Sequence, residues 1–222
     1  MFFHWLEKNP FFFASGISLV ISFAGLIEIV PNFAQGSRPL VDLQPRTVLE
    51  LAGKNVYMKD NCIACHSQLI RPFKSETDRY GAYSLSGEYA YDRPFLWGSK
   101  RTGPDLHRVG NYRTTDWHEN HMLDPKAIVQ GSIMPAYDHM FENTADIETA
   151  YAEAVTVKNM FHTPYGPEFR KTQKAWDAHR PKVLEDAKKI AADMKDPRVK
   201  EAIAKGEIPE IVAIIAYLNS LK

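Results

Sequence analysis

The feature that most constrains the fold is a short motif, C-I-A-C-H at residues 62–66, which holds both cysteines of the 222-residue chain. A structural zinc site takes about four ligands, usually supplied as two pairs, and the chain has no second cysteine pair. A thioredoxin-like redox pair belongs to a strand–helix setting, and the sequence shows no such alternation. The same motif, C-x-x-C-H, is the attachment signature of c-type haem. We therefore predict one covalently bound haem c, around which the chain must fold.

The motif assigns a role to each of its reactive side chains. Cys62 and Cys65 are predicted to form thioethers with the haem vinyl groups. His66, on the same helical turn, is predicted to bind the iron. This assignment accounts for the cysteine total, because one haem uses both thiols and leaves none free.

A low-spin electron carrier needs a second axial ligand, which is commonly a methionine. Met134 is the favoured candidate, because it lies in the stretch G-S-I-M-P-A-Y. Gly131 and Pro135 in this stretch predict a stiff, irregular loop that can direct a thioether inward. Met140 and His139 are the alternative ligands. The other histidines of this region are expected to be surface or hydrogen-bonding residues: His107, His118 and His121.

The N-terminal region is predicted to be embedded in a membrane. Residues 11–27 carry no charge, and Glu28 is the only ionisable residue of the predicted span at about residues 10–30. A run of about 20 apolar residues rises about 30 Å as a helix, which matches the hydrocarbon core of a bilayer. A cleaved secretory signal has a shorter apolar region and a small-residue cleavage site, for which P-N-F-A-Q-G at residues 31–36 is a poor match. A buried core helix is the other alternative.

We expect residues 1–31 to form a retained, single-pass anchor and residues 32–222 to form the haem domain. Flanking charge does not favour an inside N-terminus, because Lys8 precedes the span while Arg38 and Arg46 follow it. Haem c is attached outside the bacterial cytoplasmic membrane. The motif therefore predicts an inner-membrane protein with a cytoplasmic N-terminus and a periplasmic haem domain.

The stretch R-T-G-P-D-L at residues 101–106 matches the T-G-P-N-L stretch of class I cytochromes c. In that class the proline carbonyl accepts a hydrogen bond from the ligand histidine, so the resemblance assigns this role to Pro104. Asp105 stands where the class has asparagine. This difference leaves the role of Pro104 intact, because that role belongs to a backbone carbonyl. The resemblance also implies that an N-terminal and a C-terminal helix cross where a glycine admits an aromatic side chain.

Two segments have the spacing of amphipathic helices, residues 46–61 and residues 208–221. They are the predicted crossing helices, with Gly53 of the first against Tyr217 of the second. Pro209 suits a position in the first turn of the second helix. Two amphipathic helices of any helical core would show the same pattern.

The chain contains two segments that a minimal class I cytochrome c does not have. The first, residues 69–100, mixes basic and tyrosine residues: Arg71, Lys74, Arg79, Tyr80, Tyr83, Tyr89, Tyr91 and Arg93. Such a mixture can bind nucleic acid, but a periplasmic location argues against it. The balanced charge of 27 basic and 27 acidic residues gives no indication of such a partner. We predict that this segment packs on a membrane partner, with a solvated loop as the alternative.

The second additional segment, residues 144–207, is predicted to form charged, solvated helices interrupted by prolines. Four prolines mark these interruptions: Pro164, Pro167, Pro181 and Pro197. Asp196 and Pro197 are predicted to be the N-cap and the first residue of a helix.

The chain as a whole resembles the mono-haem cytochrome c subunit, subunit II, of cbb3-type cytochrome c oxidases. The resemblance rests on the stretches C-H-S-Q-L-I-R-P-F, R-Y-G-A-Y-S, W-G-S-K-R-T-G-P-D-L and S-I-M-P-A-Y, and on the anchor and the last helix. It implies a mainly α protein, in which one transmembrane helix precedes a class I cytochrome c domain with helical and loop insertions.

The resemblance also implies partners. The subunit would take electrons from a di-haem cytochrome c subunit or a soluble cytochrome c. It would pass them to haem b of a many-span catalytic subunit, where haem b3 and copper reduce oxygen. No catalytic residue is expected in this chain, and a copper-bearing subunit II would need two further cysteines. The alternatives are a membrane-anchored cytochrome c of another reductase, such as nitric oxide reductase, a haem-based gas sensor, and a purely structural assembly subunit.

Overall fold

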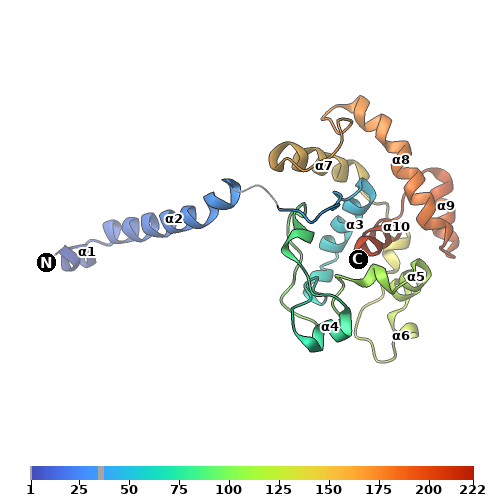
Figure 1. The fold of residues 1–222 in the computed structure, drawn as a ribbon, viewed down its shortest axis with the longest axis horizontal. Helices are drawn as coiled ribbons and strands as arrows, with labels where there is room; N and C mark the ends of the chain where they lie inside the picture. Colours follow the sequence, from blue (N-terminus) through green and yellow to red (C-terminus); the bar gives the residue numbers. More distant parts are fainter. Residues whose placement is uncertain (1, 35–37) are drawn as a thin grey trace. The chain divides into compact units, whose positions relative to one another are not determined.

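The computed structural model describes residues 2–34 and 38–222 (Figure 1). The chain divides into two compact units, Met1–Arg38 and Pro39–Lys222. Helices build both units, and the described residues contain no strand beyond one isolated bridge. The predicted mainly α fold is therefore confirmed.

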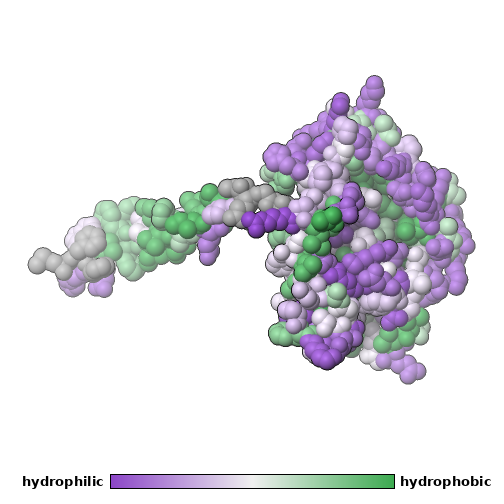
Figure 2. Space-filling model, in the orientation of Figure 1, coloured by the Kyte–Doolittle hydropathy of each residue, from purple (hydrophilic) through white to green (hydrophobic). Residues whose placement is uncertain are grey.

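The first unit contains a short helix, α1 (Phe2–Lys8), and a long helix, α2 (Pro10–Ala34). The stretch Pro10–Pro31 is long and apolar enough to cross a membrane, and its most apolar window is not buried. Figure 2 shows hydrophobic residues along much of α2. The predicted span is thus a continuous helix, and this helix runs past Pro31 to Ala34.

In the second unit, α3 (Val48–Lys59) begins at a capping box. The hydroxyl of Thr47 accepts a hydrogen bond from the backbone N–H of Glu50, at 3.3 Å. The backbone N–H of Thr47 in turn donates to the Glu50 carboxylate, at 2.7 Å. A capping box satisfies backbone donors that the start of a helix leaves unpaired, and it explains why the helix begins here, inside the predicted segment 46–61.

The C-terminal helix α10 (Glu210–Ser220) packs across α3. A Cβ atom on Gly53 would lie 2.0 Å from the carbonyl oxygen of Ala213 and 2.8 Å from the Cβ of Tyr217. Only a glycine permits this approach of two backbones. The predicted contact of Gly53 with Tyr217 is confirmed, and the Ala213 carbonyl lies closer still. Pro209 is the N-cap of α10 rather than a residue of its first turn.

Helices of various lengths lie between α3 and α10 in the sequence. In chain order they are η1 (Cys62–Ala64), α4 (Lys74–Tyr80), η2 (Ser86–Tyr89), η3 (Val109–Asn111), α5 (Thr115–Leu123), α6 (Pro125–Ile128), η4 (Asp138–Phe141), α7 (Ile147–Phe161), α8 (Gln173–Ala192) and α9 (Pro197–Lys205). Figure 1 shows α4, α5 and α6 on one side of the second unit and α7, α8 and α9 on the other.

The segment 69–100 contains α4 and η2, and several of its predicted surface residues have partners within the chain. Tyr89 is buried, donates a hydrogen bond to the carbonyl oxygen of Gln68 at 2.6 Å and stacks on His107. The exposed aromatic residues of the segment are Phe73, Tyr83, Phe95 and Trp97. Packing of this segment on a membrane partner stays a prediction.

The segment 144–207 is helical, but it is not simply solvated. Helix α7 packs against α3, and α8 packs against α10. Their buried residues are Ala150, Tyr151, Ala154, Val155, Val183, Ala187 and Ala191. Pro181 does not interrupt the chain, because α8 continues through it with the ring on the exposed side. Asp196 caps α9 and Pro197 is its first residue, as predicted.

Candidate haem site

A cavity of about 560 Å³ lies in the second unit, and it brings together residues that are far apart in the sequence. Cys62 and His66 line it from the C-x-x-C-H motif, Pro104 from the following loop, and Met134 from the loop between α6 and η4. Cys65 is exposed and does not line the cavity. Four of the five predicted site residues therefore share one cavity.

The motif forms a single tight turn. The backbone N–H of Cys65 and that of His66 both donate to the carbonyl oxygen of Cys62, at 3.1 and 2.9 Å. Asn61, just before the turn, has a φ of 55°, in the left-handed region that asparagine tolerates. Both the histidine and the first cysteine of this turn line the cavity.

The imidazole of His66 is held by a hydrogen bond at its Nδ1 atom. Its Nδ1 lies 2.8 Å from the carbonyl oxygen of Pro104. A carbonyl oxygen only accepts hydrogen bonds, so Nδ1 must carry the proton, and the lone pair of Nε2 is free for a metal. The phenol of Tyr57 donates to the carbonyl oxygen of His66 at 3.1 Å. The contact with Pro104 fixes the orientation of the ring, as second-sphere hydrogen bonds do for metal-binding histidines. The contact with Tyr57 holds the backbone of His66.

Gly103 contributes by having no side chain. A Cβ atom at this position would lie 2.3 Å from the Cε1 of His66, well inside van der Waals contact. Its backbone N–H donates to the carbonyl oxygen of Cys65 at 2.9 Å, which ties this loop to the motif. The role of Gly103 was not foreseen from the sequence, although the residue lies within the T-G-P-D-L stretch.

Met134 is partly buried in a loop that is fixed at both ends. Gly131 has a φ of 76°, a left-handed conformation that favours glycine. Farther along, the backbone N–H of Tyr137 donates to the carbonyl oxygen of Met122 at 2.8 Å. The alternative ligands lie elsewhere: Met140 is fully buried in the hydrophobic core, and neither it nor His139 lines the cavity.

A comparison with protein families finds a match over residues 3–222, to the family described as cytochrome c oxidase, mono-heme subunit/FixO. The chain belongs to this family. It is therefore a mono-haem cytochrome c subunit of a cbb3-type oxidase. A comparison with curated individual proteins finds no match. The single C-x-x-C-H motif of the sequence agrees with one haem in this FixO-family subunit.

The residues of the cavity fit a haem. Its volume lies within the range of about 300 to 1,000 Å³ that is usual for cofactor sites, and most of its wall is aromatic or aliphatic. An imidazole nitrogen and a thioether sulfur are the donors typical of a class I haem. Two buried nitrogens of α5, Nε2 of His118 and Nδ1 of His121, have no hydrogen-bond partner among the described residues.

Burial sets the electrostatics of the cavity in this FixO-family subunit. It lowers the pKa of His66, and it lowers the pKa of His118 to about 4 with help from His121 and Arg113. Burial raises the pKa of the Cys62 thiol to about 12. Burial also raises the pKa of Tyr137 to about 12. Each of these groups is therefore neutral near pH 7.

Sequence reasoning also missed the role of the Asp105 side chain. Its Oδ2 accepts hydrogen bonds from the Ser67 hydroxyl at 2.7 Å and from the Leu69 N–H at 2.8 Å. Its Oδ1 accepts one from the N–H of His107 at 2.9 Å. The carboxylate thus fastens the loop after Pro104 to the chain that follows the haem motif. His118 was expected to be hydrogen-bonded or on the surface, and it is instead a buried residue of the cavity wall.

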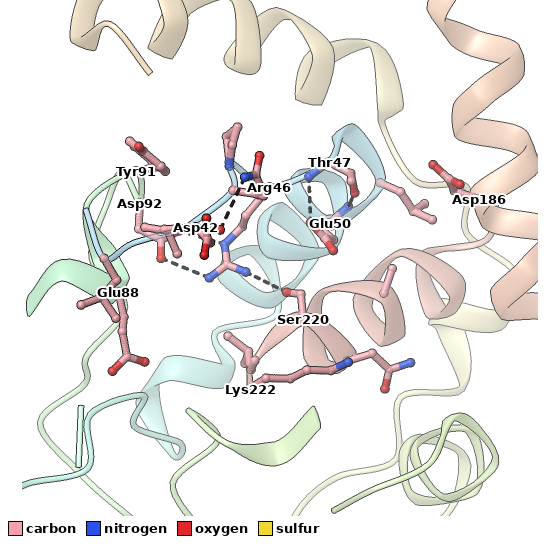
Figure 3. Close-up of a pocket in the computed structure, with 18 of the residues that line it drawn as sticks. Asp42, Arg46, Thr47, Glu50, Glu88, Tyr91, Asp92, Asp186, Ser220 and Lys222 are labelled. Atoms are coloured by element: carbon pink, nitrogen blue, oxygen red, sulfur yellow. Dashed lines mark hydrogen bonds and ion pairs between the residues drawn. The ribbon is translucent and has the colours of Figure 1, made fainter. Parts of the chain in front are cut away.

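A second and larger cavity, about 1,010 Å³, contains none of the predicted haem ligands (Figure 3). It lies between the first residues of the second unit and the end of α10. Arg46 joins these parts, because its guanidinium donates to Asp92 at 2.9 Å and to the Ser220 hydroxyl at 2.7 Å. Arg46 thereby anchors the entering chain to the C-terminal helix, away from the haem cavity.

Proposed function

We propose that this subunit carries one covalently attached haem c and relays single electrons. The electrons come from a di-haem cytochrome c subunit or a soluble cytochrome c. The subunit passes these electrons to haem b of a many-span catalytic haem-copper subunit, where oxygen is reduced. The observation that carries the proposal is the shared cavity of Cys62, His66 and Met134, together with the hydrogen bond from His66 to Pro104.

In this proposal each residue of the site has a separate task. The sulfurs of Cys62 and Cys65 would hold the haem through thioethers to its vinyl groups, and Nε2 of His66 and Sδ of Met134 would bind the iron. The haem, when bound, supplies the one-electron carrier. The hydrogen bond to Pro104 keeps the imidazole in one tautomer and one orientation, so the protein reorganises little when the charge at the site changes. The thioether of Met134 favours the reduced state.

The membrane arrangement is part of the proposal. Helix α2 spans the bacterial inner membrane once, with the N-terminus in the cytoplasm and the haem domain in the periplasm. The length and apolar composition of Pro10–Pro31 support the span, and the site of haem c attachment supports the orientation. A phosphatase that is active only in the periplasm, fused after Lys222, should be active in cells. An inactive fusion that is nevertheless produced would contradict this orientation.

The chain alone is not expected to reduce oxygen, because it offers one haem site and the proposal needs haem b3 and copper for that step. Membranes solubilised in a mild detergent test the partnership. The subunit should elute with a large subunit that contains b-type haem, and its own haem should be reduced before haem b when a donor is added. Elution as a lone cytochrome in several mild detergents would contradict the relay.

Two further measurements test the haem itself. The denatured chain should keep one haem on a gel, whereas extraction of the haem into acidified acetone would contradict covalent attachment. The reduced haem c should be low-spin and should not respond to carbon monoxide. A response to carbon monoxide would favour an open sixth position, as in a gas sensor.

A further inference from the structure

The haem cavity carries positive charge that no side chain of its wall balances. Arg79 and Arg113 line it, and the described residues of its lining include no aspartate or glutamate. Neither guanidinium forms an ion pair with a described residue. Arg79 lies over the ring of Tyr80, and Arg113 lies 4.3 Å from the ring centre of Trp117. Arginines in such a setting bind carboxylates or phosphates with charge-assisted hydrogen bonds.

Helix α5 adds unused hydrogen-bonding groups to the same wall. The side chain of His118 is 2 % exposed, and its Nε2 has no partner among the described residues. Three residues on, and therefore on the same face of the helix, Nδ1 of His121 is also buried without a partner. Buried polar groups of native proteins are hydrogen-bonded. The two nitrogens thus indicate that a ligand with polar atoms completes this part of the cavity.

These groups are held together by stacking. The rings of Trp117 and His121 lie 4.5 Å apart with an angle of 21° between their planes, and the Arg113 guanidinium packs over the same indole. A stacked indole orients a planar guanidinium without forming hydrogen bonds to it. The N–H groups of Arg113 therefore remain available to a ligand.

The occupant that this wall fits is a carboxylate attached to a flat apolar molecule. A haem offers two such groups, its propionates, on an otherwise apolar macrocycle. We propose that Arg113, His118 and His121 bind a haem propionate, and that Trp117 positions Arg113 and His121 for it. The inference rests on the proposed haem at Cys62, Cys65 and His66, and it assigns the propionate end of the cavity to α5 and the residues just before it.

The proposal has an electrochemical consequence. Ferric haem carries one more positive charge than ferrous haem, so an uncompensated propionate stabilises the ferric state. Arg113 compensates this negative charge and thereby raises the midpoint potential. The same positive charge should also keep the propionate ionised, since an opposite charge nearby lowers the pKa of a carboxyl group.

The test uses the assembled oxidase with haem labelled by ¹³C at the propionate carboxyl carbons. Arg113→Gln is compared with Arg180→Gln, which removes the same charge from an exposed position on α8. We expect Arg113→Gln to lower the midpoint potential of haem c and to shift the labelled carboxylate bands in redox difference infrared spectra. Arg180→Gln should change neither. Equal potentials and equal carboxylate bands in the two variants would overturn the role of Arg113.

A second pair of variants tests the buried histidine. His118→Leu should shift the labelled carboxylate bands, whereas His118→Gln, which keeps an N–H donor, should restore them at least in part. Unshifted bands in a His118→Leu protein that retains covalent haem would overturn the role of His118. Haem staining of the denatured wild-type chain separates the two proposals: absence of covalent haem contradicts the proposed function, whereas covalent haem with unaffected propionates contradicts only this inference.

Discussion

The Nδ1 atom of His66 lies 2.8 Å from the carbonyl oxygen of Pro104. Gly103, which directly precedes Pro104, permits this contact because it has no side chain. The imidazole ring passes so close to Gly103 that a Cβ atom would overlap it, at 2.3 Å from Cε1. The backbone N–H of Gly103 also donates a hydrogen bond to the carbonyl oxygen of Cys65. The loop that contains Gly103 therefore cannot move away from the imidazole without breaking this hydrogen bond. The orientation of the proposed iron ligand therefore depends on a residue without a side chain.

The first prediction follows from this contact. Gly103→Ala should displace the imidazole of His66 and lengthen its hydrogen bond to Pro104. We expect a fraction of the protein to lose the low-spin, six-coordinate ferric spectrum, with a lower yield of haem-containing chain. Absorption and electron paramagnetic resonance spectra measure the spin state. Thr102→Ala is the matched control, because Thr102 is exposed; identical spectra for the two variants would show that the contact is harmless.

The second prediction concerns the sixth ligand. Met134→His should keep the iron six-coordinate but replace a thioether with an imidazole, which favours the ferric state. The midpoint potential should fall substantially, because methionine–histidine sites have higher potentials than bis-histidine sites. Oxidase turnover should fall with it while haem b stays intact. Redox titration followed at the haem c absorption band measures the shift.

Met140→Leu is the control for this experiment. Met140 is fully buried in the core and does not line the haem cavity. A swap that conserves volume costs less than about 1.5 kcal/mol in a packed core, so potential and turnover should stay nearly unchanged. A potential that responds to Met140→Leu and not to Met134→His would mean that the loop around Met134 has only a structural role.

Short motifs made much of this site predictable. The covalent and iron-binding roles proposed for Cys62, Cys65 and His66 stay predictions, and they follow from the local C-x-x-C-H motif alone. The crossing of the terminal helices at Gly53 was also predictable, because a helix that carries a glycine on its apolar face can approach another backbone closely. The motif depends on neighbouring residues that the sequence displays together, whereas the contact of Gly53 with Tyr217 joins the two ends of the domain and was expected from the resemblance to class I cytochromes c.

Other parts of the site depend on contacts between distant segments. Only the carbonyl of the neighbouring Pro104 had a predicted role, so Asp105 looked interchangeable with asparagine. Its carboxylate nevertheless accepts hydrogen bonds from four separate residues: Ser67, Leu69, Arg101 and His107. His118 looked like one histidine among several, and only the fold places its nitrogen in the cavity wall. Pro181 predicted an interruption, but packing of one face of α8 outweighs the hydrogen bond that the proline removes.

The third prediction tests the Asp105 network. Oδ1 and Oδ2 of Asp105 both accept hydrogen bonds, and an asparagine would place an N–H group where one of these acceptors stands. At least one buried donor then loses its partner, at a cost of about 1 to 3 kcal/mol. Asp105→Asn should lower the free energy of unfolding by this amount. Urea unfolding followed by tryptophan fluorescence measures the change, and an unaltered midpoint would show that the carboxylate is not needed.

A related network joins this loop to α4. The carboxylate of Glu76 is buried and accepts hydrogen bonds from the guanidinium of Arg101 at 2.8 Å and from the backbone N–H of Arg71 at 2.8 Å. Arg101 also donates to the hydroxyl of Ser67, next to the proposed iron ligand, at 2.7 Å. The hydrogen bond from Arg101, followed by those from Arg71, lowers the pKa of Glu76 from 4.5 to about 2.

The last prediction is the pH dependence that follows. Because the folded state lowers the pKa of Glu76, the ionised carboxylate stabilises the fold fully above pH 4.5, and this stabilisation is lost as the pH falls from 4.5 toward 2. Glu76→Gln should therefore be less stable than the wild type at neutral pH, and the difference should shrink as the pH falls through this window. Urea unfolding of the detergent-solubilised subunit at several pH values gives the two curves. Glu207→Gln is the control, because Glu207 is exposed and has no ion pair among the described residues. Its free energy of unfolding should follow the pH in the same way as that of the wild type. The same pH dependence for Glu76→Gln would contradict the contribution of the Glu76 carboxylate to stability.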